Sequence, residues 1–275
     1  MLANYHTHTI RCKHAVGSER EYIESAIDKG FKILGFSDHV PQPYPEGFVS
    51  PIRMDMSELK DYTDTLLGLR SEYKDKIQIL IGYEVEYSRQ YFRPLIRELK
   101  KYPLDFMILG QHHVPDEVNG RYVGFETTSE KELTEYVDFC IEGMETGLFL
   151  YLAHPDLIRF KGADDVYMKQ MERLAEAMAD LDIPAEVNMY GFADGRNYPC
   201  DSFFDMASKK GLRFIVGCDA HSPKFLMQPE ELKGFNDFLK RNRIEYGDNV
   251  IKVFDIWDRI ARYEMRQQNE NGDII

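Results

Sequence analysis

KILGFSDH, at residues 32–39, shows a pattern that organises the whole chain. Its apolar run is typical of a buried strand, and it ends in Asp38 and His39, two side chains that can bind a metal ion. The pattern of a short apolar run with polar residues at its end recurs along the sequence. We expect strands at 2–6, 32–38, 77–84, 105–111, 148–154, 184–188 and 213–219.

Amphipathic segments separate these strands. Their apolar residues recur every three to four positions, as Met171, Leu174 and Met178 do, and this spacing predicts helices. We expect helices at 18–30, 56–73, 91–102, 129–147, 165–181 and 202–211, with caps at Ser18 and Ser129, and a closing helix at 248–268. Seven β-α alternations without a linker predict a single-domain α/β fold with one parallel, helix-covered sheet, either open or closed into a barrel.

The composition limits the partners of the protein. A net charge of −13, from 47 acidic and 34 basic residues, argues against nucleic acid or a membrane surface as a partner. Four scattered cysteines without a CxxC pair indicate free thiols in a reducing compartment. The start MLANYH has no basic or apolar leader, and no apolar run approaches the ~18 residues of a membrane span. These features predict a cytoplasmic protein and leave its oligomeric state open.

Histidines gather at the ends of the predicted strands. Seven of the eight lie there: His6, His8, His39, His112, His113, His154 and His221. Glu84 and Asp219 also lie at strand ends, and His14 follows the first strand closely enough to reach them. Because the carboxyl ends of parallel strands open on one face, we expect these side chains to share one rim.

The spacing of these residues favours metal binding. Residues two apart on a strand point to the same side, so His6 and His8 can hold one cation, as can Asp219 and His221. Imidazoles and carboxylates without a set of thiolates suit zinc, manganese or iron. The ligands exceed what one ion needs, so we expect two or three divalent or transition-metal ions, with Glu84 bridging neighbours.

The motifs HTH (6–8), SDH (37–39), GYE (82–84), GQHH (110–113), AHPD (153–156) and GCDAH (217–221) resemble those of the PHP (polymerase and histidinol phosphatase) superfamily. AHPDLIRF (153–160), EVNMYGFADGRNYPC (186–200) and FSDHVPQP (36–43) are similar to its histidinol-phosphatase branch. The resemblance implies a distorted TIM-like (β/α)7 barrel over residues 1–266, with the metal site at the C-terminal rim of the strands, and a polar tail at 267–275.

The resemblance also implies a ligand set for each of three ions. It places His6, His8, Glu84 and Asp219 around the first ion, His14, His39 and His221 around the second, and Glu84, His112 and His154 around the third. A family member usually has an aromatic residue where this chain has His113. The histidine of this motif normally lies two residues after the glycine, which selects His112 as the ligand. The departure at His113 leaves the choice between His112 and His113 open, and a His113 that is not a ligand would support a ligand or face the substrate.

The activity that the resemblance implies is hydrolysis of the phosphomonoester L-histidinol phosphate in histidine biosynthesis. A multi-metal site activates water, so we expect attack by a metal-bridging hydroxide rather than a covalent phosphoenzyme. Arginine suits bidentate phosphate binding. We expect catalytic roles for Asp156, Arg159, Arg196 and His39, and substrate binding by Arg159, Arg196 and His113. Glu86, Tyr87, Asp194 and Tyr190 lie in loops that can reach the amine and the imidazole of this substrate.

Other functions are compatible with parts of the pattern. Another PHP phosphoesterase, acting on tyrosine-phosphorylated protein or on nucleotides, would share the metal motifs. An amidohydrolase also begins with HxH, but it relies on a lysine at a strand end, which this chain lacks. A non-catalytic metal-binding module would be expected to have lost ligands, whereas this chain keeps them.

Overall fold

The computed structural model of the chain describes residues 1–272. Four parallel strands pair in sequence order, and two later strands, also parallel, pair with each other. A short antiparallel hairpin stands apart. The strands are β1 (Ala3–Asn4), β2 (Ile33–His39), β3 (Gln78–Val85), β4 (Phe106–Leu109), β5 (His113–Val114), β6 (Arg121–Tyr122), β7 (Ala185–Asn188) and β8 (Phe214–Gly217).

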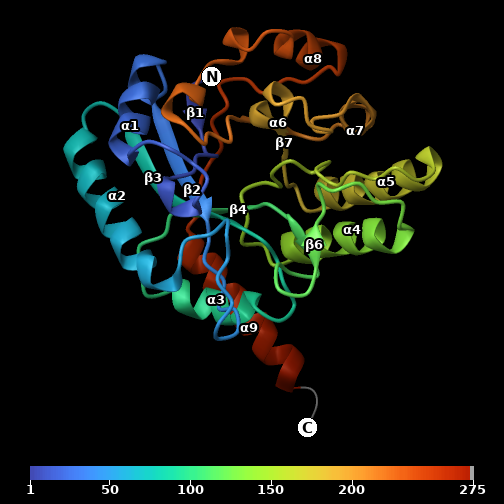
Figure 1. The fold of residues 1–275 in the computed structure, drawn as a ribbon, viewed down its shortest axis with the longest axis horizontal. Helices are drawn as coiled ribbons and strands as arrows, with labels where there is room; N and C mark the ends of the chain where they lie inside the picture. Colours follow the sequence, from blue (N-terminus) through green and yellow to red (C-terminus); the bar gives the residue numbers. More distant parts are fainter. Residues whose placement is uncertain (273–275) are drawn as a thin grey trace.

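Helices cover the outside of the parallel strands (Figure 1). Ser18 and Ser129 cap the first and fourth helices as predicted, and Ser18 forms a reciprocal capping box with Glu21. The helices are α1 (Glu19–Asp28), α2 (Leu59–Tyr73), α3 (Phe92–Leu99), α4 (Glu130–Glu145), α5 (Asp164–Asp180), α6 (Met189–Ala193), α7 (Asp201–Lys209), α8 (Phe235–Arg241) and α9 (Ile256–Gly272). The 3-10 turns are η1 (Ile10–Cys12), η2 (Met56–Glu58), η3 (Pro223–Phe225) and η4 (Pro229–Glu231).

Single parallel bridges lie between and beyond these strands. They join Leu109 to Leu152, Leu152 to Ala185, and Thr7 to Ala220. The sheet is therefore parallel and curled, and the chain has an α/β fold, as predicted. The predicted strand at 148–154 appears only as the bridge at Leu152, although its backbone donates to Met107 O and Pro184 O on either side.

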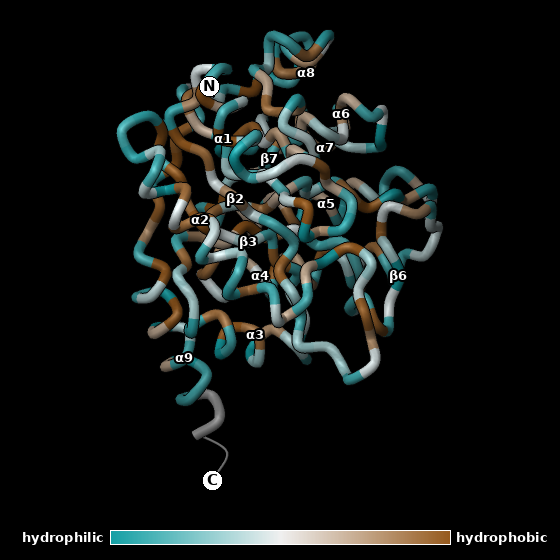
Figure 2. Tube along the Cα trace, turned by 60° about the vertical axis from the view of Figure 1, so that its left-hand side comes forward, coloured by the Kyte–Doolittle hydropathy of each residue, from teal (hydrophilic) through white to brown (hydrophobic). Residues whose placement is uncertain are grey.

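Two buried clusters fill the molecule. The larger lies between the strands and the surrounding helices, and the smaller lies inside the curl, where Phe106, Tyr151 and Ile215 pack together. Hydrophobic and hydrophilic residues alternate along the outer helices (Figure 2), as expected when one face of each helix is buried. The curl therefore has a packed interior below the strand ends.

Several elements differ from the predictions. The hairpin β5–β6 and the short helices α6 and α8 were not predicted, because each is too short for its periodicity to show. The predicted closing helix at 248–268 begins only at Ile256. Residues before it form a loop because the Asn249 side chain donates to Ala3 O and Val216 O, which ties this segment beneath β1 and β8.

The C-terminal end was also predicted differently. Helix α9 includes residues 267–272, which we expected to be tail, and residues 273–275 of that tail lie outside the described residues. The boundary of the domain at 266 remains a prediction. No helix of residues 1–272 is both long and apolar enough to cross a membrane.

A close contact inside the curl yields a test of the fold. A Cβ atom added at Gly82 of β3 would lie 2.5 Å from the Phe106 ring, whereas one added at Gly68, on the exposed face of α2, meets nothing within 4 Å. We expect Gly82→Ala to lower the free energy of unfolding by about 1–3 kcal/mol through overpacking. Gly68→Ala, the matched control, is expected to raise it by about 0.5–1 kcal/mol. Denaturant titration measures both, and equal effects would contradict the described packing.

Candidate metal centre and active site

The carboxylate of Glu84, near the end of β3, lies at the centre of a histidine cluster. Its Oε1 lies 2.9 Å from His154 Nε2, and its Oε2 lies 3.0 Å from His39 Nδ1. Three further ring nitrogens lie within 3.5–3.6 Å of the carboxylate, those of His6, His8 and His112. The predicted convergence of these residues on one rim is therefore present in the structure.

Strand ends place these residues. His39 of β2 pairs in register with Glu84 of β3, and His6 and His8 follow β1 with Thr7 between them. Both His6 and His8 turn Nε2 toward Asp219 Oδ1, at 3.4 and 3.1 Å. Asp219 has a backbone φ of 51°, a conformation that costs energy for a residue with a side chain and that clusters at functional sites.

Outer partners fix how most rings present their nitrogens. His6 Nδ1 lies 2.7 Å from Glu186 Oε1, His14 Nδ1 lies 2.7 Å from Cys12 O, and His221 Nδ1 lies 3.0 Å from Asp219 O. A ligand histidine in a metal site is normally oriented in this way by a carboxylate or a carbonyl on its other nitrogen. As a result, the Nε2 atoms of His14 and His221 face each other at 2.9 Å.

Several buried atoms of this cluster have no hydrogen-bond partner. They include His6 Nε2, both ring nitrogens of His8, His39 Nδ1, Glu84 Oε2 and Asp219 Oδ1. Buried polar atoms are normally paired, so a concentration of unpaired lone pairs in one place calls for a ligand. These atoms fit divalent cations, because imidazole nitrogen and carboxylate oxygen are their usual ligands.

The ligand atoms group into sets of suitable size. Within the described residues, five sets of three have ligand atoms within 4.8 Å of one another. The sets are His6, His8 and Asp219; His6, Glu84 and His154; His8, His39 and Glu84; His14, His39 and His221; and His8, Cys12 and His221. The set His14, His39 and His221 coincides with the group implied for the second ion. His112 belongs to no such set, although its Nε2 lies 3.5 Å from Glu84 Oε1.

The charges in the cluster favour a cation. Burial opposes ionisation of Glu84, yet the neighbouring histidines, His112 and His39 first, hold its pKa well below its ordinary value. Burial opposes a charge on His6 as well, but Glu186, Asp219 and Glu84 together raise its pKa well above its ordinary value. Burial lowers the pKa of His221 to about 3, which leaves its ring neutral and able to donate a lone pair. The carboxylates are therefore ionised around a position that attracts positive charge.

Gly110, in the motif GQHH, leaves the space that Glu84 occupies. A Cβ atom at this position would lie 1.9 Å from Glu84 Oε1. No side chain fits there, so steric exclusion explains why this motif has a glycine at position 110.

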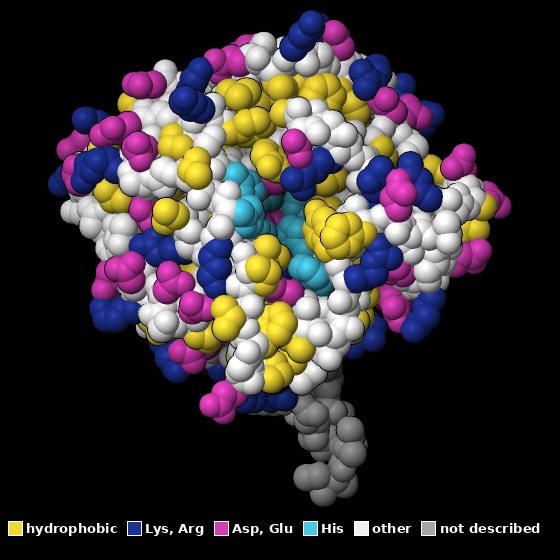
Figure 3. Space-filling model, in the orientation of Figure 1, with side chains coloured by type: hydrophobic (Ala, Val, Ile, Leu, Met, Phe, Trp, Pro, Cys, Tyr) yellow, Lys and Arg dark blue, Asp and Glu magenta, His cyan; other side chains and the backbone are white. Residues whose placement is uncertain are grey.

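The cluster opens into a cavity of about 260 Å³. In Figure 3 the histidines gather in a hollow of this face, with hydrophobic side chains and Lys or Arg side chains at its rim. Its lining includes His14, His39, Glu84, His112, His113, Asp219, His221 and Arg196, and also Ile52, Tyr122, Phe125, Tyr190 and Tyr198. Most predicted metal ligands and two predicted substrate contacts thus share one cavity.

Two predicted catalytic residues lie elsewhere. Arg159 is about half exposed, forms an ion pair with Glu126 at 2.9 Å, and does not line the cavity. Asp156 is buried outside the lining, where its Oδ2 accepts a hydrogen bond of 2.6 Å from Cys200 N. Their predicted contact with substrate is therefore without support in this geometry.

Other residues of the site were not predicted. Glu186 of β7 orients His6, and Asp38 Oδ1 lies 3.5 Å from His8 Nδ1. Tyr122, Tyr198, Phe125 and Ile52 line the cavity. The sequence already placed Asp38 at a strand end beside His39, although no role in the site was assigned to it. Nothing in the sequence distinguishes the aromatic residues from core residues.

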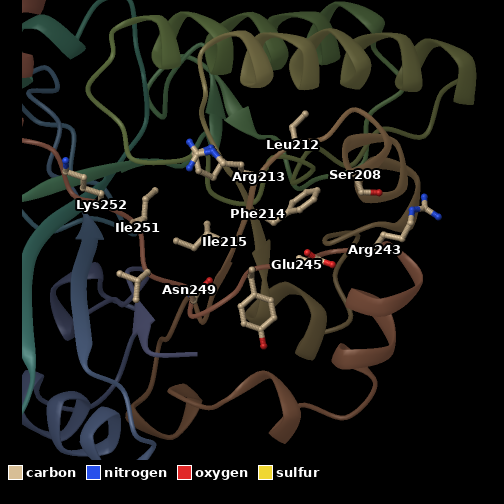
Figure 4. Close-up of a pocket in the computed structure, with 13 residues that line it drawn as sticks. Ser208, Leu212, Arg213, Phe214, Ile215, Arg243, Glu245, Asn249, Ile251 and Lys252 are labelled. Atoms are coloured by element: carbon tan, nitrogen blue, oxygen red, sulfur yellow. The ribbon is translucent and has the colours of Figure 1, made fainter.

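A second cavity, of about 490 Å³, lies at the opposite ends of β7 and β8 (Figure 4). Ile215, Phe214 and Ile251 contribute apolar side chains to it, while Arg213 and Arg243 form ion pairs with Asp182 and Asp205. Although this cavity is larger, it contains no histidine. The cavity that contains metal-binding side chains is the one above Glu84.

Comparisons with known proteins show what this chain is similar to. The PHP domain family model matches residues 4–190. The "probable histidinol-phosphatase" of Deinococcus radiodurans is 26% identical over 234 residues, which cover 81% of this chain and 87% of that protein. The histidinol-phosphatase of Lactococcus lactis is 26% identical over 234 residues, with 80% and 84% covered.

One solved structure shares the fold over most of its length. It is the crystal structure of histidinol phosphate phosphatase from Lactococcus lactis complexed with zinc, L-histidinol and phosphate. The TM-score is 0.68 at 19% sequence identity, and the match covers 88% of this chain and 94% of that one. At this identity the likeness supports the fold.

The central position of Glu84 yields a test of metal binding. We expect Glu84→Gln to lose at least one bound zinc ion per chain, because an amide replaces the carboxylate that five histidines surround. Glu126→Gln, which alters a carboxylate paired with Arg159 at the surface, is the matched control and is expected to keep the wild-type zinc content. Elemental analysis of zinc-loaded, dialysed protein measures both. Wild-type zinc content in Glu84→Gln would contradict the assignment.

Proposed function

This chain belongs to the PHP domain family, and on that premise we propose that it is a metal-dependent phosphomonoesterase that hydrolyses L-histidinol phosphate to L-histidinol and phosphate. The observation that carries the proposal is the presence of a histidine–carboxylate cluster and the guanidinium of Arg196 in one cavity. The names of the curated relatives, and the ligands of the Lactococcus lactis structure, support this substrate.

We propose two or three bound ions, of zinc, manganese or iron. Asp219 with His6 and His8 would hold one, and His14 with His39 and His221 would hold another. Glu84 with His154 and His112 would hold a third. Bound divalent ions supply Lewis acidity that activates water and stabilises charge on the phosphoryl oxygens.

Contacts with neighbouring side chains fix the orientation of the Arg196 guanidinium, which we propose binds the phosphate. Its Nε donates to Asp194 Oδ2 at 2.9 Å, its Nη1 donates to Tyr198 OH at 3.1 Å, and its guanidinium stacks 4.8 Å from the centre of the Tyr190 ring. These contacts fix the planar fork, whose shape suits the oxygens of a phosphate. As the ester P–O bond breaks and the water oxygen bonds to phosphorus, a fixed cation stabilises the charge on the phosphoryl oxygens.

Asp156 would act on Arg196 through the backbone. It accepts from Cys200 N, and Asn197 Nδ2 donates to the carbonyls of Asp156 and Leu157 at 3.1 Å. These bonds attach the loop after β7 to the segment after His154. We therefore assign Asp156 a positioning role for Arg196 and Tyr198 in place of the predicted catalytic one.

We also infer that the sheet closes into a distorted barrel of seven β/α units. The bridges at Leu152 would continue it from β4 to β7, and the bridge between Thr7 and Ala220 would return it from the end of β8 to the segment after β1. Closure would explain how ligands from the first and the last strands meet.

The cavity favours a small substrate over a macromolecule. About 260 Å³ suits a small phosphomonoester, and the net charge of −13 opposes binding of nucleic acid. A nucleotide or a phosphotyrosine side chain is the alternative substrate.

Substrate preference tests the proposal directly. We expect kcat/KM for L-histidinol phosphate to exceed that for nucleoside monophosphates and phosphotyrosine by at least about 100-fold, because contacts to both ends of a cognate substrate add to its transition-state binding. Steady-state kinetics of the zinc enzyme on this panel measures it. Equal or greater kcat/KM for a nucleotide or phosphotyrosine would refute the substrate assignment.

The two arginines provide a second test. Arg196→Ala is expected to reduce kcat/KM about 100-fold and to weaken inhibition by inorganic phosphate, because it removes the fixed cation of the cavity. Arg159→Ala, at the exposed ion pair, is expected to change kcat/KM less than about twofold. Comparable losses in the two variants would show that the assignment of the phosphate site is wrong.

A further inference from the structure

His113 is a cavity histidine that belongs to none of the metal-ligand sets of the described residues. Its ring lines the cavity, and its Nδ1 forms a hydrogen bond of 3.1 Å with Glu86 Oε1. The same carboxylate oxygen lies 3.1 Å from His112 Nδ1. Glu86 therefore contacts two rings, that of His112, which faces Glu84, and that of His113, which does not.

Glu86 is an ionised, immobile acceptor. It is buried, and it forms an ion pair with the fully buried guanidinium of Arg53, whose Nε also donates to Glu117 Oε2 at 2.8 Å. An ionised carboxylate only accepts hydrogen bonds, so Nδ1 of His113 carries the hydrogen.

The remaining nitrogen of His113 is therefore an acceptor. An uncharged imidazole with its hydrogen on Nδ1 keeps a lone pair on Nε2, and the ring of His113 lines the cavity. The backbone is fixed as well, because His113 pairs with Tyr122 across the β5–β6 hairpin and its carbonyl accepts from Gln111 Nε2 at 2.7 Å. The acceptor is thus preorganised.

The surroundings suit a cationic donor. Two carboxylates and one guanidinium, from Glu86, Glu117 and Arg53, leave a net charge of −1 behind the ring. The ring of Tyr122 lies 5.9 Å from that of His113, centre to centre, and aromatic faces attract ammonium groups. Arg196 lines the same cavity and supplies the positive charge for an anion.

We propose that His113 is a specificity-determining residue whose Nε2 accepts a hydrogen bond from the ammonium group of the substrate, with Glu86 and Arg53 as positioning residues. The inference rests on the proposed function, since it assigns the amine end of a phosphomonoester whose phosphate binds near Arg196. It predicts selection for phosphate esters that carry a primary amine.

A pair of substrates isolates this contact. L-histidinol phosphate and its analogue without the amine, imidazolylpropyl phosphate, differ in that group alone. In the wild-type zinc enzyme we expect kcat/KM to be at least about tenfold higher for the amine-containing ester, as for a hydrogen bond to a charged group. His113→Phe keeps a ring of similar size without the acceptor, and it is expected to abolish most of this ratio.

Glu86→Gln is the rescue variant, because its amide oxygen still accepts from Nδ1–H, and it is expected to retain most of the ratio. Zinc content and thermal midpoint of each variant report whether the centre and the fold are intact. A ratio near one in the wild-type enzyme, or an unchanged ratio in His113→Phe, would overturn the inference; the wild-type measurement decides even if a variant does not fold. If the enzyme prefers nucleotides or phosphotyrosine to both esters, the proposed function fails, whereas the ratio still decides the amine contact.

Discussion

The ionised carboxylate of Glu84 is buried at the centre of five histidines, and the site is organised by the need to compensate that charge. Removing a carboxylate from water costs several kcal/mol unless opposite charge and hydrogen bonds replace the solvent. Imidazole nitrogens lie at 2.9–3.6 Å on several sides of it, and Asp219 adds a second negative charge nearby. Divalent cations would balance these two carboxylates, which would link the electrostatics of the fold to a metal-dependent activity.

The strands and the outer hydrogen-bond partners hold the residues around Glu84 in place. Parallel strands bring their carboxyl ends together. Residues that are distant in sequence, such as His6 and Glu186, therefore contact each other. Around the centre, Glu186, Cys12 O and Asp219 O turn ring nitrogens inward, and Gly110 leaves the space for the central carboxylate. Beyond them, Asp194 contacts Arg196 and Glu86 contacts His113, and the side chains of Arg196 and His113 both line the cavity.

Much of this arrangement could be predicted from sequence. Strand ends marked by histidine and carboxylate place His6, His39 and Glu84 together whatever the details of the sheet, because the C-termini of parallel strands share a face. Arg159 does not line the cavity, because proximity in sequence to His154 does not fix a side chain's direction, and its partner Glu126 comes from a distant loop. Arg53 lies in an irregular loop without periodicity, so its pairing with Glu86 and Glu117 depends on tertiary contacts that local sequence does not encode. The loop at Asn249 replaced a predicted helix for the same reason, since side-chain bonds to Ala3 and Val216 compete with helical ones.

The central claim is that the cluster around Glu84 binds metal ions that act on a phosphate held by Arg196. Anomalous diffraction at the zinc edge, from crystals grown with zinc and inorganic phosphate, tests it most directly. We expect anomalous peaks in contact with Glu84, with Asp219 and with the pair His14 and His221, and phosphate density between these peaks and Arg196. Absence of anomalous density in this cavity, or phosphate bound at Arg159 and away from the cluster, would contradict it.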